Sequence, residues 1–384
     1  MARETTGYRG AVEMMTTVEI NDRIDPLEAE WERLAQHLQA SPFLRPGWAG
    51  AWWRAFGVGR LQILAAYQNG NLTGVLPLRR YRGVLSSTTN DHSPLFGVLA
   101  ANGTAADALA RALFSQKPRR IDLSLLPSSD VGVSLVHTAA GAAGYRVIAD
   151  SMHRSPYVVV NETSWDAYQS GLSKNLRQDV RRRERQLGKG GRLKLEVCDG
   201  TKRLDELLEE GFSIEGSGWK ETEGTSINAH PTTRRFYTET ARWAAEGGFL
   251  RLAFLRLDGQ PLAFDFCLES HKIHYLIKTG YDPAYAIFSP GKVLRHLMIA
   301  RAFSEGLAVY DMGGLVEPYK QRYTDRHREL QSLRMFAPTP LGLLDRKAFE
   351  YGRPAYERAK GLARSTLGER GFRLLQRGRR WFNA

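Results

Sequence analysis

The chain has 384 residues, of which 42% are hydrophobic and 25% charged, a composition typical of globular proteins. Its length fits two domains of roughly 150–200 residues better than one. No hydrophobic run reaches the roughly 18–20 residues of a membrane-spanning helix. Residues 1–10 do not resemble a secretory signal, and the two cysteines are too few for a disulfide framework, so we expect a cytoplasmic protein. The formal net charge of +13 favours anionic partners such as nucleotide phosphates, tRNA or an anionic membrane surface.

The first half of the sequence predicts two helices, a hairpin, and then alternating helices and strands. Asp25-Pro26 is typical of a helix start, because Asp caps free amide groups and Pro fits the first turn. The tryptophan-rich residues 48–56 predict a second, well-buried helix. Asn69-Gly70, between two apolar runs, predicts the turn of a hairpin over residues 61–81. We expect further helices over residues 105–114 and 133–143 and strands over residues 120–125 and 145–149.

The second half repeats this plan. We expect strands over residues 193–197, 272–279, 308–311 and 329–336, helices over 203–212, 233–245 and 291–305, and a hairpin over 250–269. Because the same order of elements occurs twice, the sequence predicts an internal duplication. The expected fold is α+β (α/β), with two tandem domains that each contain a mixed, mainly antiparallel sheet flanked by helices. We place the domains at residues 1–160 and 193–340, a basic linker helix at 161–192, and a basic amphipathic helical tail at 341–384.

Residues 281–292 join a predicted strand to a predicted helix and suit an anionic ligand. Ser289-Pro290-Gly291 opens the helix, and a helix N-terminus presents unpaired amide groups and a partial positive charge that favour a phosphate. Gly291 lets a ligand approach the backbone, and Lys292 adds a positive charge. The alternative is purely structural, with Ser289 as the helix cap and Pro290 as a first-turn proline.

A second candidate segment follows at residues 309–323. A predicted strand ends in Asp311-Met312-Gly313-Gly314, and a short helix with Tyr319 and Lys320 comes next. Ligands and catalytic side chains gather at such an edge of a sheet. Asp311 is therefore a candidate base, and Lys320 is a candidate ligand for a phosphate or a developing oxyanion. The alternative is an Asp-Gly turn with a surface salt bridge.

Basic residues concentrate in the predicted linker and in the tail. Lys174, Arg177, Arg181 and Arg185 fall on roughly one helical face. This face is either solvated, a wall that binds an anion, or a surface that docks tRNA. The tail combines arginines with aromatic residues, which suits either packing or peripheral contact with anionic lipid.

Several short motifs, taken in order, resemble the landmarks of one family. They are Ser41-Pro42-Phe43-Leu44, Trp52-Trp53, Gly74-Val75-Leu76-Pro77-Leu78, Leu172-Ser173-Lys174-Asn175-Leu176-Arg177, Gly218-Trp219-Lys220, Ser289-Pro290-Gly291, Asp311-Met312-Gly313-Gly314 and Tyr319-Lys320. Over about residues 31–336 they resemble the BioF2-like acetyltransferases of the GNAT superfamily, also called CelD-like after a cellulose-biosynthesis protein. A more distant resemblance is to the Fem aminoacyltransferases of peptidoglycan bridge synthesis, which pair two GNAT-like domains.

The resemblance implies two GNAT-like domains and transfer of an acyl group from a thioester or an acyl-tRNA. In GNAT proteins the loop before the central helix holds the donor pyrophosphate through backbone amides, and here that loop is residues 288–292, with Ser289, Gly291 and Lys292. The loop departs from the family pattern of spaced glycines, and Pro290 removes one amide. The first half has no comparable loop at residues 90–94. We therefore expect that copy to be degenerate and to shape the acceptor cleft.

The expected activity is transfer from acetyl-CoA or another acyl-CoA to an amine or hydroxyl of a cell-envelope or polysaccharide precursor. Backbone amides near Ile277 and Thr279 hold the donor carbonyl in this mechanism. A base (Asp311, Asp282 or His274, or water) accepts the proton of the acceptor, and Tyr281 or Tyr319 protonates the leaving group. The candidate acceptor-binding residues are Lys174, Arg177, Trp219, Lys220 and Asp265.

Two other activities stay open. One is a Fem-like aminoacyltransferase that uses aminoacyl-tRNA, and the other is a non-catalytic protein that binds an anionic polymer or a membrane. No His or Cys pair has metal-ligand spacing, so no metal is expected. Under each hypothesis we expect a cytoplasmic location, with the basic tail available for contact with the inner face of the membrane.

Overall fold

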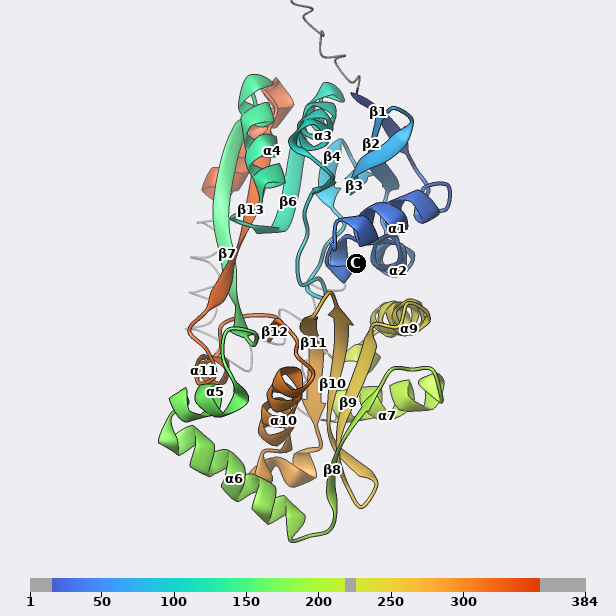
Figure 1. Ribbon diagram of the computed structural model, residues 1–384. Coiled ribbons are helices and arrows are strands. Elements are labelled where there is room, and N and C mark those ends of the chain that lie inside the picture. The colour runs from blue at the N-terminus through green and yellow to red at the C-terminus, as the bar shows by residue number, and fades with distance from the viewer. Residues whose placement is uncertain (1–15, 218–225, 353–384) are drawn as a thin grey trace, which may run out of the picture.

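The computed structural model describes residues 16–217 and 226–352, whose strands form one long mixed sheet flanked by helices (Figure 1). The sheet has 13 strands in the order β1-β2-β3-β4-β6-β13-β7-β12-β11-β10-β9-β8, with β5 paired to β3. Neighbouring strands are antiparallel except for β4 with β6 and β11 with β12. The predicted mixed, mainly antiparallel sheet flanked by helices is therefore confirmed.

The elements of the first half follow the expected order. Its strands are β1 (Thr16–Asn21), β2 (Arg60–Gln68), β3 (Asn71–Tyr81), β4 (Val84–Ser87), β5 (Leu99–Ala100), β6 (Arg120–Pro127) and β7 (Arg146–Val159). Its helices are α1 (Glu28–His37), η1 (Pro42–Leu44), α2 (Pro46–Phe56), α3 (Gly103–Ser115) and α4 (Val131–Ala142). The sequence did not predict β1, β4 or β5, which are short or lie at an edge of the sheet.

The second half has the same order of elements. Its strands are β8 (Leu193–Cys198), β9 (Leu250–Leu257), β10 (Gln260–Ser270), β11 (Ile273–Tyr281), β12 (Val309–Asp311) and β13 (His327–Phe336). Its helices are α5 (Trp165–Gly171), α6 (Lys174–Gly188), α7 (Leu204–Gly216), η2 (Ile227–Ala229), α9 (Pro231–Glu246), η3 (Pro283–Phe288), α10 (Pro290–Ser304) and α11 (Pro318–Gln321). Residues 340–352 are helical as well, and the rest of the predicted tail lies outside the described residues.

The predicted linker helix is two helices. The break falls between α5 and α6, where Ser173 caps α6 by accepting a hydrogen bond from the Leu176 amide at 3.2 Å. The residues on both sides of Ser173 favour a helix, so the sequence predicted one continuous helix and the cap at Ser173 was not recognised. Because Leu176 and Val180 of α6 are buried in the same core as α10, this segment is part of the second half.

The last described strand lies in the sheet of the first half. Strand β13 pairs with β6 on one side and with residues 146–156 of β7 on the other, while residues 157–159 of β7 pair with β12. Figure 1 shows β7 and β13 running together from one half to the other. This differs from the expectation that residues 193–340 form one unit, because pairing between strands distant in the sequence decides where β13 lies.

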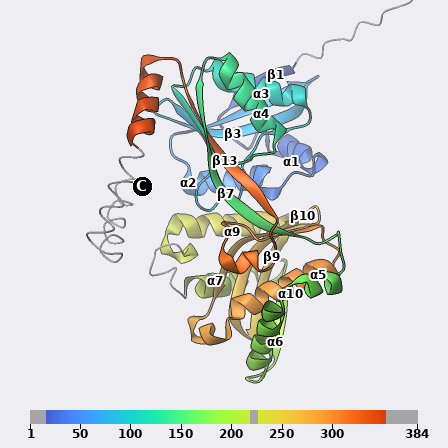
Figure 2. The ribbon, with the colours of Figure 1, turned by 90° about the vertical axis from the view of Figure 1, so that its left-hand side faces the viewer.

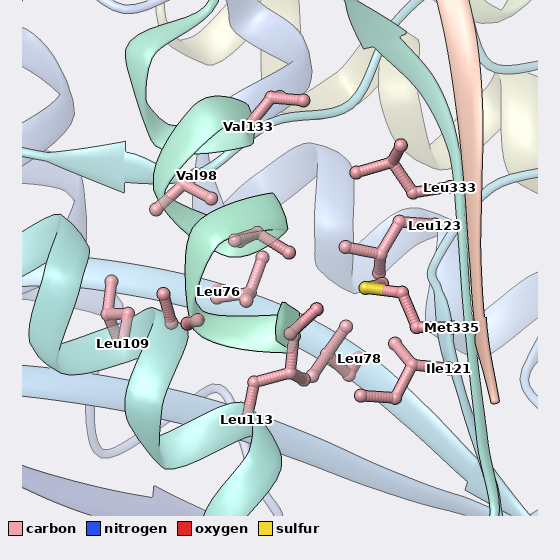
Figure 3. Close-up of a cluster of buried hydrophobic side chains, with 14 of the residues drawn as sticks. Leu76, Leu78, Val98, Leu109, Leu113, Ile121, Leu123, Val133, Leu333 and Met335 are labelled. Atoms are coloured by element: carbon pink, nitrogen blue, oxygen red, sulfur yellow. The ribbon is translucent and has the colours of Figure 1, made fainter. Parts of the chain in front are cut away.

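Strand β13 completes the core beneath α3 and α4. Leu333 and Met335 lie beside Ile121 and Leu123 of β6 in this core (Figure 3). All four side chains are no more than 1% exposed, so each contributes roughly 1.5–3 kcal/mol of burial free energy. The first half therefore cannot form its complete core without residues that come late in the chain.

A second core joins the two halves through α2 and α9, which lie next to each other at the boundary (Figures 1 and 2). Trp48 of α2 meets Phe236 of α9 edge to face, with ring centroids 5.1 Å apart. A β-carbon on Gly47 would lie 2.1 Å from the Trp243 ring, so only glycine allows this approach. The tryptophan-rich helix is therefore buried against the second half.

His92 lies at this boundary between the two halves, and its burial makes the stability of the protein depend on pH. Burial lowers the pKa of His92 to about 4, with help from the charges of Lys278 and His230. The unfolded chain takes up a proton near pH 6.5 but the folded protein does not, so stability is lost as the pH falls from 6.5 towards 4. We expect His92→Gln to reduce the loss of unfolding free energy between pH 6.5 and 5 by up to about 2 kcal/mol.

Urea unfolding at the two pH values measures this change. His271→Asn, at the exposed turn between β10 and β11, is the control and should keep the pH dependence of the native protein. Equal pH dependence in the native protein and in His92→Gln would contradict the assignment.

Candidate active site

A cavity of about 690 Å³ opens where strands β11 and β12 part. The two strands pair only from Ile273 with Val309 to Tyr275 with Asp311, whereas β11 continues to Tyr281 along its other neighbour, β10. Residues 276–281 of β11 all line the cavity. Because alternate backbone groups of a strand point to each side, this stretch presents hydrogen-bonding groups to the cavity along an unpaired edge.

Two glycines after β12 keep the strands apart. Gly313 and Gly314 have φ angles of +60° and +58°, which favour glycine. A β-carbon on Gly313 would lie 2.3 Å from the Leu276 carbonyl oxygen of β11. The Asp311 carboxylate accepts a hydrogen bond from the Gly313 amide at 2.9 Å and thereby fixes the turn.

The start of α10 forms another wall of the cavity, to which Ser289, Gly291 and Lys292 contribute. Ser289 stands at the N-cap position and Pro290 in the first turn, as in the structural alternative, but Ser289 has a φ of +49° and its side chain makes no capping hydrogen bond. In contrast, the start of α3 in the first half is capped by Asn102, which accepts from the Ala105 amide at 2.9 Å. Of these two helix starts, that of α10 is the one without a side-chain cap on its first turn.

Lys292 is tied to α6 by an ion pair. Its Nζ lies 2.5 Å from Asp179 Oδ2, and Arg183 Nε lies 2.9 Å from Asp179 Oδ1. Burial alone would raise the pKa of Asp179, but hydrogen bonds from Lys292 and Arg182 hold it well below its usual range. The Lys292 charge is therefore partly neutralised, and its ammonium group also fixes α10 against α6.

Asp311 and Lys320, the predicted base and oxyanion ligand, hold the loop between β12 and α11. Asp311 is 4% exposed, does not line the cavity, and pairs with Arg328 at 2.7 Å. Lys320 lines the cavity, but its Nζ donates to the carbonyl oxygens of Gly313 and Leu315 and pairs with Glu317 at 3.0 Å. The structure thus gives both side chains positioning contacts.

Three tyrosines face the cavity: the predicted Tyr281 and Tyr319, and also Tyr323. Burial raises the pKa of Tyr319 to about 12 although Arg295 opposes this, and burial raises the pKa of Tyr323 to about 12 as well. These two hydroxyl groups are therefore protonated at neutral pH and can donate hydrogen bonds.

The three predicted acceptor-binding residues that the structure describes do not line this cavity. Lys174 is exposed, Arg177 donates to the Leu172 carbonyl at 3.2 Å, and Asp265 is 1% exposed within the sheet, and none of the three lines the cavity. Trp219 and Lys220 lie outside the described residues. Helical periodicity predicts which basic side chains share one face of α6. It does not predict whether that face is directed towards β11.

Glu215 and Arg295 also line the cavity, and the sequence did not predict either residue there. Glu215, at the end of α7, is 1% exposed and accepts from the Ile227 amide at 2.7 Å. A β-carbon on Gly280 of β11 would lie 2.4 Å from its Cα, so this glycine lets the helix reach the unpaired strand edge. Nothing in the local sequence marks either residue, because charged residues are ordinary on amphipathic helices.

The turn at Gly313 gives a prediction about stability. Gly313→Ala adds backbone strain and a clash with Leu276, so we expect a loss of about 2–4 kcal/mol in unfolding free energy, measured by urea titration. Gly259→Ala is the control, because Gly259 has a φ of +88° and no described residue lies within 4 Å of its β-carbon position; it should lose only about 1 kcal/mol. Equal losses in the two variants would contradict the close approach of Gly313 to β11.

The structure has no helix that is long and apolar enough to cross a membrane within the described residues. In the same part of the chain, no three His, Cys, Asp or Glu side chains gather as metal ligands would.

Comparison with known proteins assigns this arrangement to a fold. Residues 174–321 match the family model described as an acetyltransferase (GNAT) domain. The structure is similar to FemX, at 14% identity and a TM-score of 0.56 over 86% of this chain and 99% of that chain. It is also similar to the C-terminal domain of an Agrobacterium fabrum protein described as a lysylphosphatidylglycerol synthetase, at 9% identity and a TM-score of 0.54 over 85% and 96%.

A search of curated protein sequences finds no match. At these identities the two solved structures show the fold alone, and they extend over both halves of the chain. The predicted tandem GNAT-like fold is thus confirmed, and the segment that matches the family model contains β11, α10 and the turn at Gly313. The chain contains a GNAT acetyltransferase domain in its second half and is an acyltransferase.

Proposed function

We propose that the protein transfers an acyl group from acetyl-CoA or another acyl-CoA to an amine or hydroxyl of a cell-envelope or polysaccharide precursor. The observation that carries the proposal is one cavity lined by both the unpaired edge of β11 and the uncapped start of α10. An acyl-CoA needs both surfaces, because it has anionic phosphates at one end and an amide-rich arm that leads to a thioester.

In this proposal each of the two surfaces binds a different part of the donor. First-turn amides of α10 near Gly291 receive the phosphates, because a helix N-terminus attracts anions. Alternate backbone groups of β11 near Ile277 and Thr279 receive the arm and the thioester carbonyl. A carbonyl held by a backbone amide is polarised, and that amide also stabilises the negative charge that develops on its oxygen during attack.

The acceptor attacks the thioester carbon, so that a new C–N or C–O bond forms and the C–S bond breaks. Glu215 is the proposed base that takes the proton of the acceptor, in place of Asp311, because it lines the cavity next to Gly280 at the strand edge. Tyr281 or Tyr319 donates a proton to the departing thiolate of CoA. Positioning of the two substrates supplies much of the rate.

Binding of the donor is tested with Gly291→Trp. Among the described residues, Tyr281 alone comes within 4 Å of the Gly291 β-carbon position, at 3.7 Å, so the indole should fill the cavity and leave the fold intact. We expect acetyl-CoA to raise the Tm of the native protein and not that of the variant. Gly103→Trp, at the start of α3 with no described residue within 4 Å of its β-carbon position, should respond as the native protein does. An unchanged shift in Gly291→Trp would move the donor site elsewhere.

The proposed base is tested with Glu215→Gln. We expect kcat to fall by about 10²–10⁴-fold while the Kd for acyl-CoA stays within about threefold, because general-base catalysis is lost but the donor contacts remain. Release of the CoA thiol in the presence of an amine panel measures the rate. Glu317→Gln, which changes a second cavity carboxylate paired with Lys320, is the control and should lose less than about tenfold. Similar losses in both variants would argue against Glu215.

A second candidate activity is aminoacyl transfer from aminoacyl-tRNA. It is favoured by the similarity to FemX over nearly the whole of both chains, since the resemblance to Fem proteins implies such a donor. The test measures acyl transfer with charged tRNA and with acyl-CoA as donors in parallel reactions. Transfer from charged tRNA alone would select this candidate. Membership of the BioF2-like (CelD-like) group is part of the acyl-CoA proposal, and not of this second candidate.

We also propose that residues 1–160, completed by β13, form a degenerate GNAT-like copy that shapes the acceptor side of the site, and that the residues between 160 and β13 form the acyltransferase domain. Asn102, which caps α3, supports the absence of a donor site at that helix start. A cytoplasmic location with the basic tail at the inner face of the membrane would bring the site close to envelope precursors.

A further inference from the structure

The cavity has a buried arginine in its wall. Arg295 of α10 is 3% exposed and lines the cavity. Its Nη2 lies 3.4 Å from Thr279 Oγ1 and 3.8 Å from Asp265 Oδ1. The Nε and Nη1 atoms have no hydrogen-bond partner within 3.5 Å among the residues that the structure describes, and the buried Tyr310 hydroxyl also lies near the guanidinium. Such a buried group is unfavourable unless water or a ligand completes its hydrogen bonds.

The charge of this arginine is only loosely balanced. Burial by itself would lower the pKa of Arg295, but Asp265 raises it above the usual value, so the guanidinium stays charged. The 3.8 Å separation is longer than the roughly 2.8 Å of a close ion pair, and neither Asp265 oxygen has a hydrogen-bond partner in the described chain. Arg295 lines the cavity, whereas its counter-ion Asp265 does not.

Hydroxyl groups near this arginine add donors. The Tyr323 hydroxyl has no partner in the described part of the chain, and the residue is 4% exposed and lines the cavity. Tyr319 lines it too and lies near enough for Arg295 to affect its pKa. A buried cation with protonated hydroxyls beside it suits a ligand that has negative charge and several acceptor oxygens.

We propose that this wall of the cavity binds a carboxylate, carried either by the acyl group of the donor or by the acceptor, with Arg295 as the specificity-determining residue. The inference rests on the proposed acyl-CoA function. The donor phosphates are assigned there to Gly291, one helical turn before Arg295, so the anion at Arg295 is a different group. A guanidinium matches the planar shape and charge of a carboxylate.

The first arm of the experiment tests the donor. Succinyl-CoA and butyryl-CoA have acyl chains of equal length, but one ends in a carboxylate and the other in a methyl group. If the donor carries the carboxylate, the native protein should bind succinyl-CoA at least about tenfold more tightly in a calorimetric titration.

The second arm tests the acceptor. Amino acids and their amides are offered in matched pairs with acetyl-CoA, and release of the CoA thiol is followed. If the acceptor carries the carboxylate, the free acids should have kcat/KM values at least about tenfold above those of the amides.

The preference is then assigned to Arg295 by substitution. Arg295→Gln is combined with Asp265→Asn, because removal of one partner alone would leave a buried unpaired charge. We expect this double variant to bind succinyl-CoA and butyryl-CoA equally well, and to use amino acids and their amides with equal kcat/KM. Tyr323→Phe, which keeps the ring and removes one hydroxyl, should lower the preference about threefold, and it provides a milder test that does not alter the ion pair.

Arg322→Gln is the matched control. Arg322 is an exposed arginine on the same cavity, so its loss should weaken binding of both CoA esters about equally and keep the preference. A ratio near one in both arms of the native protein overturns the proposal, and so does a preference that survives in the double variant. Binding of butyryl-CoA with no preference in either arm contradicts the carboxylate site alone, whereas absence of all acyl-CoA binding contradicts the proposed function and this site with it.

Discussion

The short pairing between β11 and β12 is the constraint on which the active site depends. Only three residue pairs join the two strands before Gly313 turns the chain away, with its Cα so close to the Leu276 carbonyl that a β-carbon would not fit. A longer β12 would pair with residues 276–281 and close the cavity. Asp311 and Lys320 both stabilise this turn. Asp311 accepts a hydrogen bond from the Gly313 amide, and Lys320 donates one to the Gly313 carbonyl oxygen.

The walls of the cavity are fixed by contacts between the two halves. Strand β13 adds its side chains to the core of the first half, and β7 pairs with β12 in the second half. Residue His92 of the first half lies 3.3 Å from the Tyr237 hydroxyl, and the Tyr237 ring lies under Lys278 of the cavity at 5.9 Å. A change in the packing of either half therefore reaches β11 through a few contacts.

Buried polar groups distinguish the cavity from the apolar cores of the described residues. Arg295, Glu215 and Lys320 are each at most 4% exposed and all three line the cavity. Their desolvation opposes folding, and their charges are balanced by Asp265, by Lys278 and by Glu317. Of these pairs the one at Arg295 is the least complete, since two of its nitrogen atoms lack a partner among the described residues.

The sequence by itself determined the features that depend on neighbouring residues. Asn69-Gly70 and Asp258-Gly259 favour positive φ angles, and hairpins turn at both. The segments around Ser289 and Lys320 were identified as candidates because strand ends and helix starts have local signatures, and the structure brings both segments to one cavity. The order of helices and strands was sufficient to predict two halves of the same fold.

Only the tertiary structure decided which side chains face the cavity. Aspartates such as Asp311 and Asp265 are typical catalytic or binding residues, but Asp311 is buried and paired with Arg328, and Asp265 is buried 3.8 Å from Arg295. Glu215 and Arg295 look like ordinary helix residues until α7 and α10 pack against β11. The place of β13 was decided in the same way, because hydrogen bonds between strands join residues far apart in the chain, and no signal within a few residues of β13 specifies its neighbours.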